Sequence, residues 1–300
     1  MKIHKHLVSV VVEALDSIFE EGQYADKVIQ RNLKAQKQWG ARDRRFFAES
    51  VYEIVRWERL LNYLAESDDF WFIWGAYWIK QGNEALPDWP ELGDLNESEV
   101  RARLKNLPSF AVAQSIPDWM EKRLHQELGE DYKDVVRALN QPAEVFLRTN
   151  ILKTNPDDLI KTLADAGVMA VKVEGLPHTL KLHERKNVFI TEPFKKGLFE
   201  VQDAASQMVV PLLDIQPGQR VVDACAGAGG KRLHMASLMK NKGKILSLDI
   251  HEWKLNELKV RARRAGVDVI ETRVIESSKV IKRLESSADR GLLDVPCSGI

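Results

Sequence analysis

The residues best suited to chemistry surround a glycine-rich turn in the last third of the chain. Residues 225–231 (Cys-Ala-Gly-Ala-Gly-Gly-Lys) follow Val221, Val222 and Asp223, and they precede a stretch typical of a helix start. Glycine permits positive φ and close approach of a ligand to the backbone, and a helix N-terminus offers unpaired N–H groups. The order of strand, tight turn and helix therefore predicts a ligand site at this turn.

A second carboxylate follows at the end of the next apolar segment. Residues 244–249 (Lys-Ile-Leu-Ser-Leu-Asp) read as a strand that ends in Asp249. In doubly wound sheets a carboxylate at this place accepts hydrogen bonds from ribose hydroxyls. The turn lacks the Gly-x-Gly-x-x-Gly spacing of dinucleotide sites, and Arg232 stands where a P-loop would have Ser or Thr. The pattern favours a nucleoside-bearing cofactor over a nicotinamide or flavin dinucleotide.

Four motifs in order resemble those of one enzyme family. They are residues 199–207 (Phe-Glu-Val-Gln-Asp-Ala-Ala-Ser-Gln), residues 223–231, Asp249, and residues 292–299 (Leu-Leu-Asp-Val-Pro-Cys-Ser-Gly). Together they resemble the RNA cytosine-C5 methyltransferases of the Sun (Fmu) type, in which the first motif is a lead-in helix. The resemblance implies S-adenosylmethionine as the cofactor. By resemblance its binding residues are Cys225, Ala226, Gly227, Ala228, Gly229, Gly230, Lys231, Asp249, Glu276 and Asp294.

The same resemblance implies catalytic roles for Asp294 and Cys297. Carbon 5 of cytosine is a poor nucleophile, so a thiolate must first add at carbon 6. By resemblance Asp294 holds the N3 and N4 edge of the ring, and Cys297, presented by Pro296, assists product release. In the family a second cysteine, in a later Thr-Cys-Ser motif, makes the covalent bond. The sequence ends at Ile300 without that motif, so we expect a C-terminally truncated member.

Three positions depart from the family pattern. The third strand of the predicted sheet ends in Ile275-Glu276, where the family has an Asp near the adenine. Either Glu276 replaces that Asp or Ile275 occupies the position. Ala228 stands at a usual Pro, and Gly291 interrupts a strand that is normally apolar.

The alternation of elements predicts that these motifs share one edge of a parallel sheet. Strands are expected at about 219–224, 244–249, 267–275 and 289–294, with helices at about 231–240, 252–265 and 277–285. Ligands of such sheets lie beyond the carboxyl ends of the strands. We therefore expect residues 199–300 to form an incomplete α/β Rossmann-like domain that binds S-adenosylmethionine.

Two further domains are expected upstream. Helical periodicity predicts an all-α domain over residues 1–141, which resembles the NusB-like RNA-binding domain of many Sun-type enzymes at residues 39–45 (Trp-Gly-Ala-Arg-Asp-Arg-Arg). That basic cluster is either a solvated helix start or a contact for RNA phosphates. The aromatic stretch 71–78 predicts a helix buried in the bundle. Residues 142–198 predict a small α+β module that resembles an RNA-recognition domain, with short strands that include 188–190.

Composition limits the class of protein. Lys and Arg total 44, as do Asp and Glu, so a basic surface must be local, as in residues 27–59 and 231–264. Two cysteines exclude a disulfide framework and a Cys-rich zinc site, and no run of 18 apolar residues occurs. We expect a soluble cytoplasmic monomer without metal or membrane attachment.

The sequence thus predicts an S-adenosylmethionine-dependent RNA cytosine-C5 methyltransferase, with ribosomal RNA favoured over transfer RNA as substrate. The alternative is a non-catalytic RNA-binding fragment that retains affinity for the cofactor. The N-terminal domains disfavour a third reading, DNA methylation through Cys297.

Overall fold

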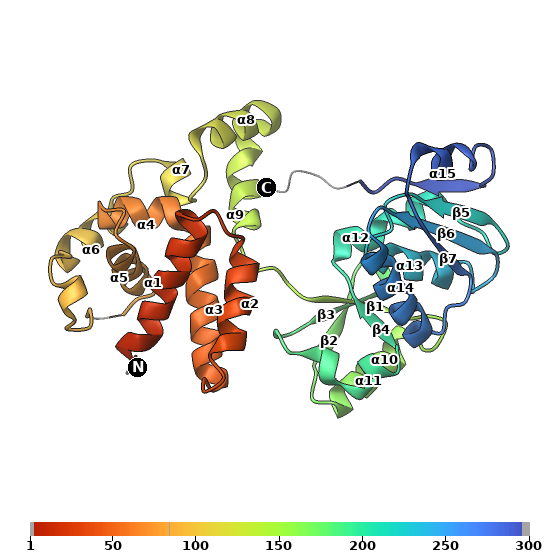
Figure 1. The fold of residues 1–300 in the computed structure, drawn as a ribbon, viewed down its shortest axis with the longest axis horizontal. Helices are drawn as coiled ribbons and strands as arrows, with labels where there is room; N and C mark the ends of the chain where they lie inside the picture. The colour runs from red at the N-terminus through yellow and green to blue at the C-terminus, as the bar shows by residue number, and fades with distance from the viewer. Residues whose placement is uncertain (1–2, 84, 296–300) are drawn as a thin grey trace. The chain divides into compact units, whose positions relative to one another are not determined.

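The structure, a computed structural model, describes residues 3–83 and 85–295. The chain divides into two compact units, Met1–Gln141 and Pro142–Ile300 (Figure 1). Among the described residues, no helix combines the length and the apolar character that crossing a membrane requires.

The first unit is built of helices throughout its described part. Its α-helices are α1 (Lys5–Phe19), α2 (Ala25–Ala35), α3 (Ala41–Arg56), α4 (Glu58–Ala65), α5 (Phe70–Lys80), α6 (Glu97–Lys105), α7 (Phe110–Ala113), α8 (Asp118–Leu128) and α9 (Tyr132–Leu139), with 3-10 turns η1 (Pro90–Leu92) and η2 (Gly129–Asp131). Its main core is apolar and includes residues of α1, α3, α4 and α5.

The aromatic stretch predicted to be buried forms α5. The Asp69 side chain caps this helix by accepting the N–H of Trp71 at 2.7 Å. Trp74 is fully buried, and its ring stacks on Trp78 and Trp89 with centroid distances of 5.5 and 5.7 Å. A helix that is apolar on most sides is stable only when surrounded by other elements, as α5 is here.

The second unit begins with an antiparallel sheet. Its strands are β1 (Phe146–Thr149), β2 (Ala170–Val173), β3 (Leu176–Leu182) and β4 (Phe199–Val201), in the order β2-β3-β1-β4, with helices α10 (Pro156–Asp165) and α11 (Glu192–Lys195) and the 3-10 turn η3 (Val188–Ile190). Leu147, Leu159, Leu163, Leu180 and Phe199 are the fully buried residues of its apolar core.

Three expectations for this region are wrong. Residues Val188–Ile190 form η3 and not a strand. Phe199–Val201 is a strand and not the start of a lead-in helix, which begins only at α12 (Ala204–Val209), capped by Asp203. Because β4 pairs with β1, the module boundary placed after residue 198 cuts a strand from its own sheet. Strand pairing joins residues about fifty positions apart, and no local pattern reports it.

A parallel sheet completes the unit. Its strands are β5 (Arg220–Asp223), β6 (Lys244–Asp249), β7 (Ile270–Val274) and β8 (Arg290–Leu292), in the order β7-β6-β5-β8, with α13 (Gly230–Leu238), α14 (Glu252–Ala265), α15 (Ser278–Lys282) and the 3-10 turn η4 (Pro211–Leu213). All three strand pairings are parallel, as expected, so the carboxyl ends of the strands meet at one edge. Several elements are shorter than expected.

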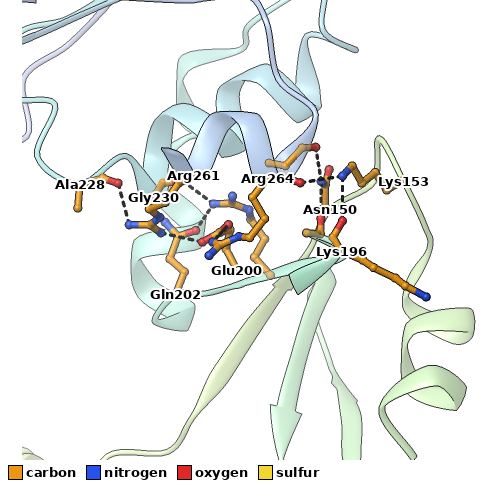
Figure 2. Close-up of polar contacts among 12 residues, drawn as sticks. Asn150, Lys153, Lys196, Glu200, Gln202, Ala228, Gly230, Arg261 and Arg264 are labelled. Atoms are coloured by element: carbon orange, nitrogen blue, oxygen red, sulfur yellow. Dashed lines mark hydrogen bonds and ion pairs between the residues drawn. The ribbon is translucent and has the colours of Figure 1, made fainter. Parts of the chain in front are cut away.

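Polar contacts join the two sheets of this unit (Figure 2). The Asn150 amide donates to the carbonyls of Gly197 and Ala265, both at 2.8 Å. Lys153 Nζ donates to the carbonyls of Lys196 and Arg264 at 2.8 and 2.7 Å. A Cβ on Gly197, whose φ is +70°, would lie 2.1 Å from the Arg264 carbonyl oxygen. Glycine here allows the two backbones to approach, so the packing of the antiparallel module against the end of α14 is closely specified.

Candidate active site

One cavity of about 640 Å³ collects most of the residues predicted to bind the cofactor. It is lined by residues 225–231, by Asp249 at the end of β6, and by Asp294 just beyond β8. Ile275 also lines it, whereas Glu276 is exposed and is not part of the lining. Further lining residues, none of which was predicted to bind the cofactor, are Gln202, Ser206, Ala224, Arg232, Ile250, His251, Lys254 and Val295.

The turn from β5 to α13 depends on glycine at two positions. Gly227 and Gly229 have φ of +48° and +97°, a region that L side chains rarely adopt. A Cβ on Gly229 would lie 2.3 Å from Cδ1 of Leu258, a buried residue of α14. The turn therefore lies directly against α14 and leaves its other side open to the cavity.

Two backbone N–H groups orient the Asp249 carboxylate, one from the glycine turn and one from the residues that follow β6. Oδ2 accepts the N–H of Gly227 at 2.8 Å, and Oδ1 accepts the N–H of His251 at 2.9 Å. Burial raises the pKa of Asp249, but the N–H groups of His251 and Gly227 outweigh it, so the net pKa is lowered. Each oxygen keeps a further lone pair, and the group stays ionised at neutral pH with acceptor capacity toward the cavity.

A buried ion pair contacts the backbone at the first residue of the turn. Asp223, fully buried at the end of β5, pairs with Arg232 of α13 and accepts the N–H of Cys225 at 3.1 Å. Arg232 also donates to the Cys225 carbonyl. Burial raises the pKa of Asp223 and lowers that of Arg232, while their mutual attraction opposes both changes. Arg232 was missed as a site residue, because its partner is evident only once β5 and α13 are folded together.

A half-exposed ion pair closes the other end of the site. Lys231 Nζ lies 2.5 Å from Asp294 Oδ2, with side chains 15% and 44% exposed. The pair connects the glycine turn to the segment after β8 and leaves the Asp294 carboxylate accessible from the cavity. The predicted Cys297 lies outside the described residues.

The Cys225 thiol is poorly suited to act as a nucleophile. Burial raises its pKa, and the nearby carboxylates of Asp223 and Asp249 raise it further. The thiolate is the reactive form, so these surroundings keep Cys225 protonated and inert at neutral pH.

Two family models match parts of this chain. The profile of the family described as 16S rRNA methyltransferase RsmB/F matches residues 210–300, and that of the RsmF/B-like ferredoxin-like domain matches residues 116–189. Residues 210–300 of the chain are thus similar to the methyltransferase domain of the RsmB/F family, and residues 116–189 to its ferredoxin-like domain. The ferredoxin-like match begins just before α8 in the first unit and ends in η3.

Curated RsmB/F relatives show the extent of the likeness. A probable ribosomal RNA small subunit methyltransferase B of Synechocystis sp. is 34% identical over 195 residues, which are 64% of this chain and 44% of the relative. One from Bacillus subtilis is 34% identical over 192 residues, covering 63% and 43%. The chain thus spans under half the length of these relatives. The enzyme of an Escherichia coli strain is 24% identical over 332 residues, covering 99% of this chain and 76% of that protein.

Solved structures support the fold. A methyltransferase homologue from Pyrococcus horikoshii is 31% identical, with a TM-score of 0.58, and covers 63% of this chain and 62% of that one. The structure of PH0851 aligns with 99% of this chain and 75% of its own length at a TM-score of 0.69. Its identity of 24% carries an argument about fold alone.

Proposed function

We propose that this chain is an S-adenosylmethionine-dependent methyltransferase that acts on carbon 5 of cytosine in ribosomal RNA. The match to the RsmB/F methyltransferase domain and the names of the curated relatives support the class of reaction and the class of substrate. The observation that carries the proposal is the meeting of the glycine turn, Asp249 and Asp294 around one cavity.

The described residues fit a nucleoside cofactor. Asp249 offers two fixed oxygens for ribose hydroxyls, which is the chemistry predicted for a carboxylate at the end of the second strand. The glycine turn admits close backbone approach, and α13 begins at Gly230 with N–H groups available to polar ligand atoms. Ile275, and not Glu276, is the third-strand residue that we assign to the adenine, because it lines the cavity and supplies apolar surface. When bound, the cofactor would supply an electrophilic methyl group.

Asp294 is the residue that we assign to the target base. It lines the same cavity, it is half exposed, and the Lys231 ammonium beside it holds its carboxylate in place. An ionised carboxylate is an acceptor for the cytosine amino group, and its protonated form would donate to N3. The cytosine must be unpaired or flipped out of a helix to reach this depth. We keep for Cys297 the role in product release that the family resemblance implies.

For the first unit we propose RNA binding, through Arg42 and Arg45 of the basic cluster. Arg44 of the same cluster is occupied within the unit, because its guanidinium donates to the carbonyls of Leu33, Gln36 and Trp39 at 2.8–3.1 Å and so closes the end of α2. Arg42 and Arg45 are exposed. A substrate in ribosomal RNA also supports the cytoplasm as the place of action.

Binding and transfer are tested separately on the full chain. Calorimetry with S-adenosylmethionine should show binding by the wild type, and Asp249→Ala should raise Kd by roughly 10–100-fold through loss of charge-assisted hydrogen bonds. Glu271→Ala is the matched control, since this exposed carboxylate of β7 pairs with Lys244 and does not line the cavity. Transfer of labelled methyl into ribosomal RNA, with nuclease digestion to identify the nucleoside, tests the reaction. It is compared between this chain and one extended through the family's Thr-Cys-Ser motif, whose cysteine makes the covalent bond. The proposal would be refuted by a wild-type chain that shows no binding at millimolar S-adenosylmethionine, or by a product other than 5-methylcytosine.

A further inference from the structure

Two arginines from outside the glycine turn donate hydrogen bonds to its carbonyl groups. Arg261 of α14 donates from Nη1 to the Ala228 carbonyl at 2.7 Å, as Figure 2 shows. Arg148 of β1, in the antiparallel sheet, donates from Nη1 to the Gly230 carbonyl at 2.6 Å. The turn is therefore held at two successive points by side chains that are distant in sequence.

Glu200 of strand β4 and Gln202, just after that strand, hold these two arginines in place. Glu200 Oε2 lies 2.8 Å from Nη2 of Arg261, and Oε1 pairs with Arg264. The Gln202 side chain accepts from Arg148 Nη1 and also lines the cavity. Figure 2 shows Glu200 and Gln202 reaching from the sheet toward the helices of the neighbouring one. The small sheet thus contacts the turn directly through Arg148 and indirectly through Glu200.

The burial of this cluster makes its hydrogen bonds directional. Arg148 is 2% exposed and Glu200 4% exposed. Burial lowers the pKa of Arg148 to about 10, with Glu200 opposing the shift, so the guanidinium stays charged at neutral pH. Charge-assisted hydrogen bonds in a water-poor site are short and strong, whereas buried ion pairs add little net stability once desolvation is counted. Compared with an apolar cluster of the same shape, this cluster is expected to contribute to geometry more than to stability, although removal of one charged partner leaves the others buried and unpaired.

We propose that Arg261 and Arg148 are positioning residues for the glycine turn, and that the antiparallel module sets the geometry of the cofactor site through them and Glu200. This assigns to the module a function in cofactor binding besides any contact with RNA. The inference rests on the proposed function for its ligand, S-adenosylmethionine.

Helix α14 offers a matched pair of arginines for the test. Arg261 and Arg264 both pair with Glu200, and their side chains are 19% and 20% exposed. Only Arg261 reaches the turn. The Arg264 guanidinium instead lies 3.9 Å from the ring centre of Phe194. Replacing either residue by Met removes one ion pair to Glu200. Arg261→Met also removes the bond to Ala228, whereas Arg264→Met also removes the contact with the Phe194 ring.

The test compares the wild type, Arg261→Met and Arg264→Met in the full chain. Calorimetry with S-adenosylhomocysteine should give a Kd about tenfold or more higher for Arg261→Met, and within about twofold of wild type for Arg264→Met. Amide hydrogen exchange without any ligand should be faster over residues 224–232 in Arg261→Met alone. Arg261→Lys keeps the positive charge, but an ammonium cannot donate to Ala228 and Glu200 from two separate nitrogens as the guanidinium does. The Kd of this variant should fall between those of the wild type and Arg261→Met.

The outcomes separate the two proposals. Equal Kd and equal exchange of the turn in both Met variants would show that the turn supports itself, and would overturn the positioning role. A wild-type chain that does not bind S-adenosylhomocysteine would count against the proposed function. In that case the ligand-free exchange comparison still decides the positioning role. Arg148→Met is the riskier variant to prepare, because that side chain is almost fully buried, and the partly exposed Arg261 keeps the test independent of it.

Discussion

Buried polar side chains are distributed very unequally between the two units. Among the described residues, Ser50 is the single buried non-aromatic polar residue of the first unit, while thirteen lie in the second. The first unit is held mainly by apolar packing, which is non-directional. The second buries charged groups whose hydrogen bonds prescribe where backbone atoms lie. The region that must hold a turn in a defined conformation for a ligand therefore uses buried, directional hydrogen bonds in addition to apolar packing.

Two ion pairs with the same N–O separation, one in each unit, show the same contrast. Arg123 pairs with Glu127 in the first unit and Arg261 with Glu200 in the second, each with an N–O separation of 2.8 Å. The side chains are 70% and 57% exposed in the first pair, and 19% and 5% exposed in the second. Solvent screens the first pair and hardly reaches the second. Distance alone therefore does not predict what either pair contributes.

The largest effect is expected in the apolar unit. Trp74→Ala should lower the free energy of unfolding of the first unit by roughly 3–5 kcal/mol, because a fully buried indole leaves a cavity that its neighbours fill only in part. Urea denaturation followed by circular dichroism measures the loss. Cofactor Kd in the folded protein should not change. A raised Kd would break the separation of roles between the units.

The next effect concerns the carboxylate of the polar cluster. Glu200→Gln should lower the stability of the second unit by roughly 3 kcal/mol, since it removes the counter-charge of buried or mostly buried arginines at positions 148, 261 and 264. The measurement is urea unfolding of the second unit, resolved by hydrogen exchange. A loss below about 1 kcal/mol would mean that water reaches the cluster.

Lowering the pH should reduce the unfolding free energy of the second unit because of His234. Burial, followed by the charges of Arg148 and His178, lowers the pKa of His234 from 6.5 to about 3. The folded state therefore holds this residue neutral, and its contribution to stability is complete above pH 6.5 and declines as pH falls toward 3, by roughly 1 kcal/mol per pH unit. Unfolding between pH 7 and 5 should show this slope. His234→Gln should flatten it, leaving the smaller part from His178, whose pKa burial also lowers.

The smallest effect is expected at the exposed ion pair. Glu127→Gln should change the unfolding free energy of the first unit by less than about 0.5 kcal/mol, because side-chain entropy and solvent screening offset the attraction. The same denaturation assay measures it beside Glu200→Gln. Equal losses for the two variants would remove burial as the explanation of the contrast.

Much of the site could be predicted because its residues are close in sequence to the strand ends that carry them. The turn at 225–231 begins two residues after β5 ends, and Asp249 is the last residue of β6. A parallel sheet brings the ends of adjacent strands to one edge. The choice between Ile275 and Glu276 could not be made from the pattern, since the residue that faces the cavity depends on how the chain leaves β7. In the structure Ile275 donates its N–H to the Asp249 carbonyl and lines the cavity.

Other features had no local signal. Strand β4 is only three residues long and forms by pairing with β1, whereas the sequence pattern predicts part of a helix there. Arg44 belongs to a basic cluster that suggests phosphate binding, yet it closes the end of α2. In each case the deciding partner is a backbone group that becomes adjacent only on folding.

The sequence by itself determined the parallel sheet, the ligand turn and the carboxylates around it, because period, glycine spacing and strand ends are local properties of the chain. Only the tertiary structure decided that Glu200 and Arg148, from the antiparallel sheet, reach Arg261 and the turn. The physical reason is that a buried charge is stable only beside partners that the fold supplies, and those partners lie about 30 to 80 residues away along the chain.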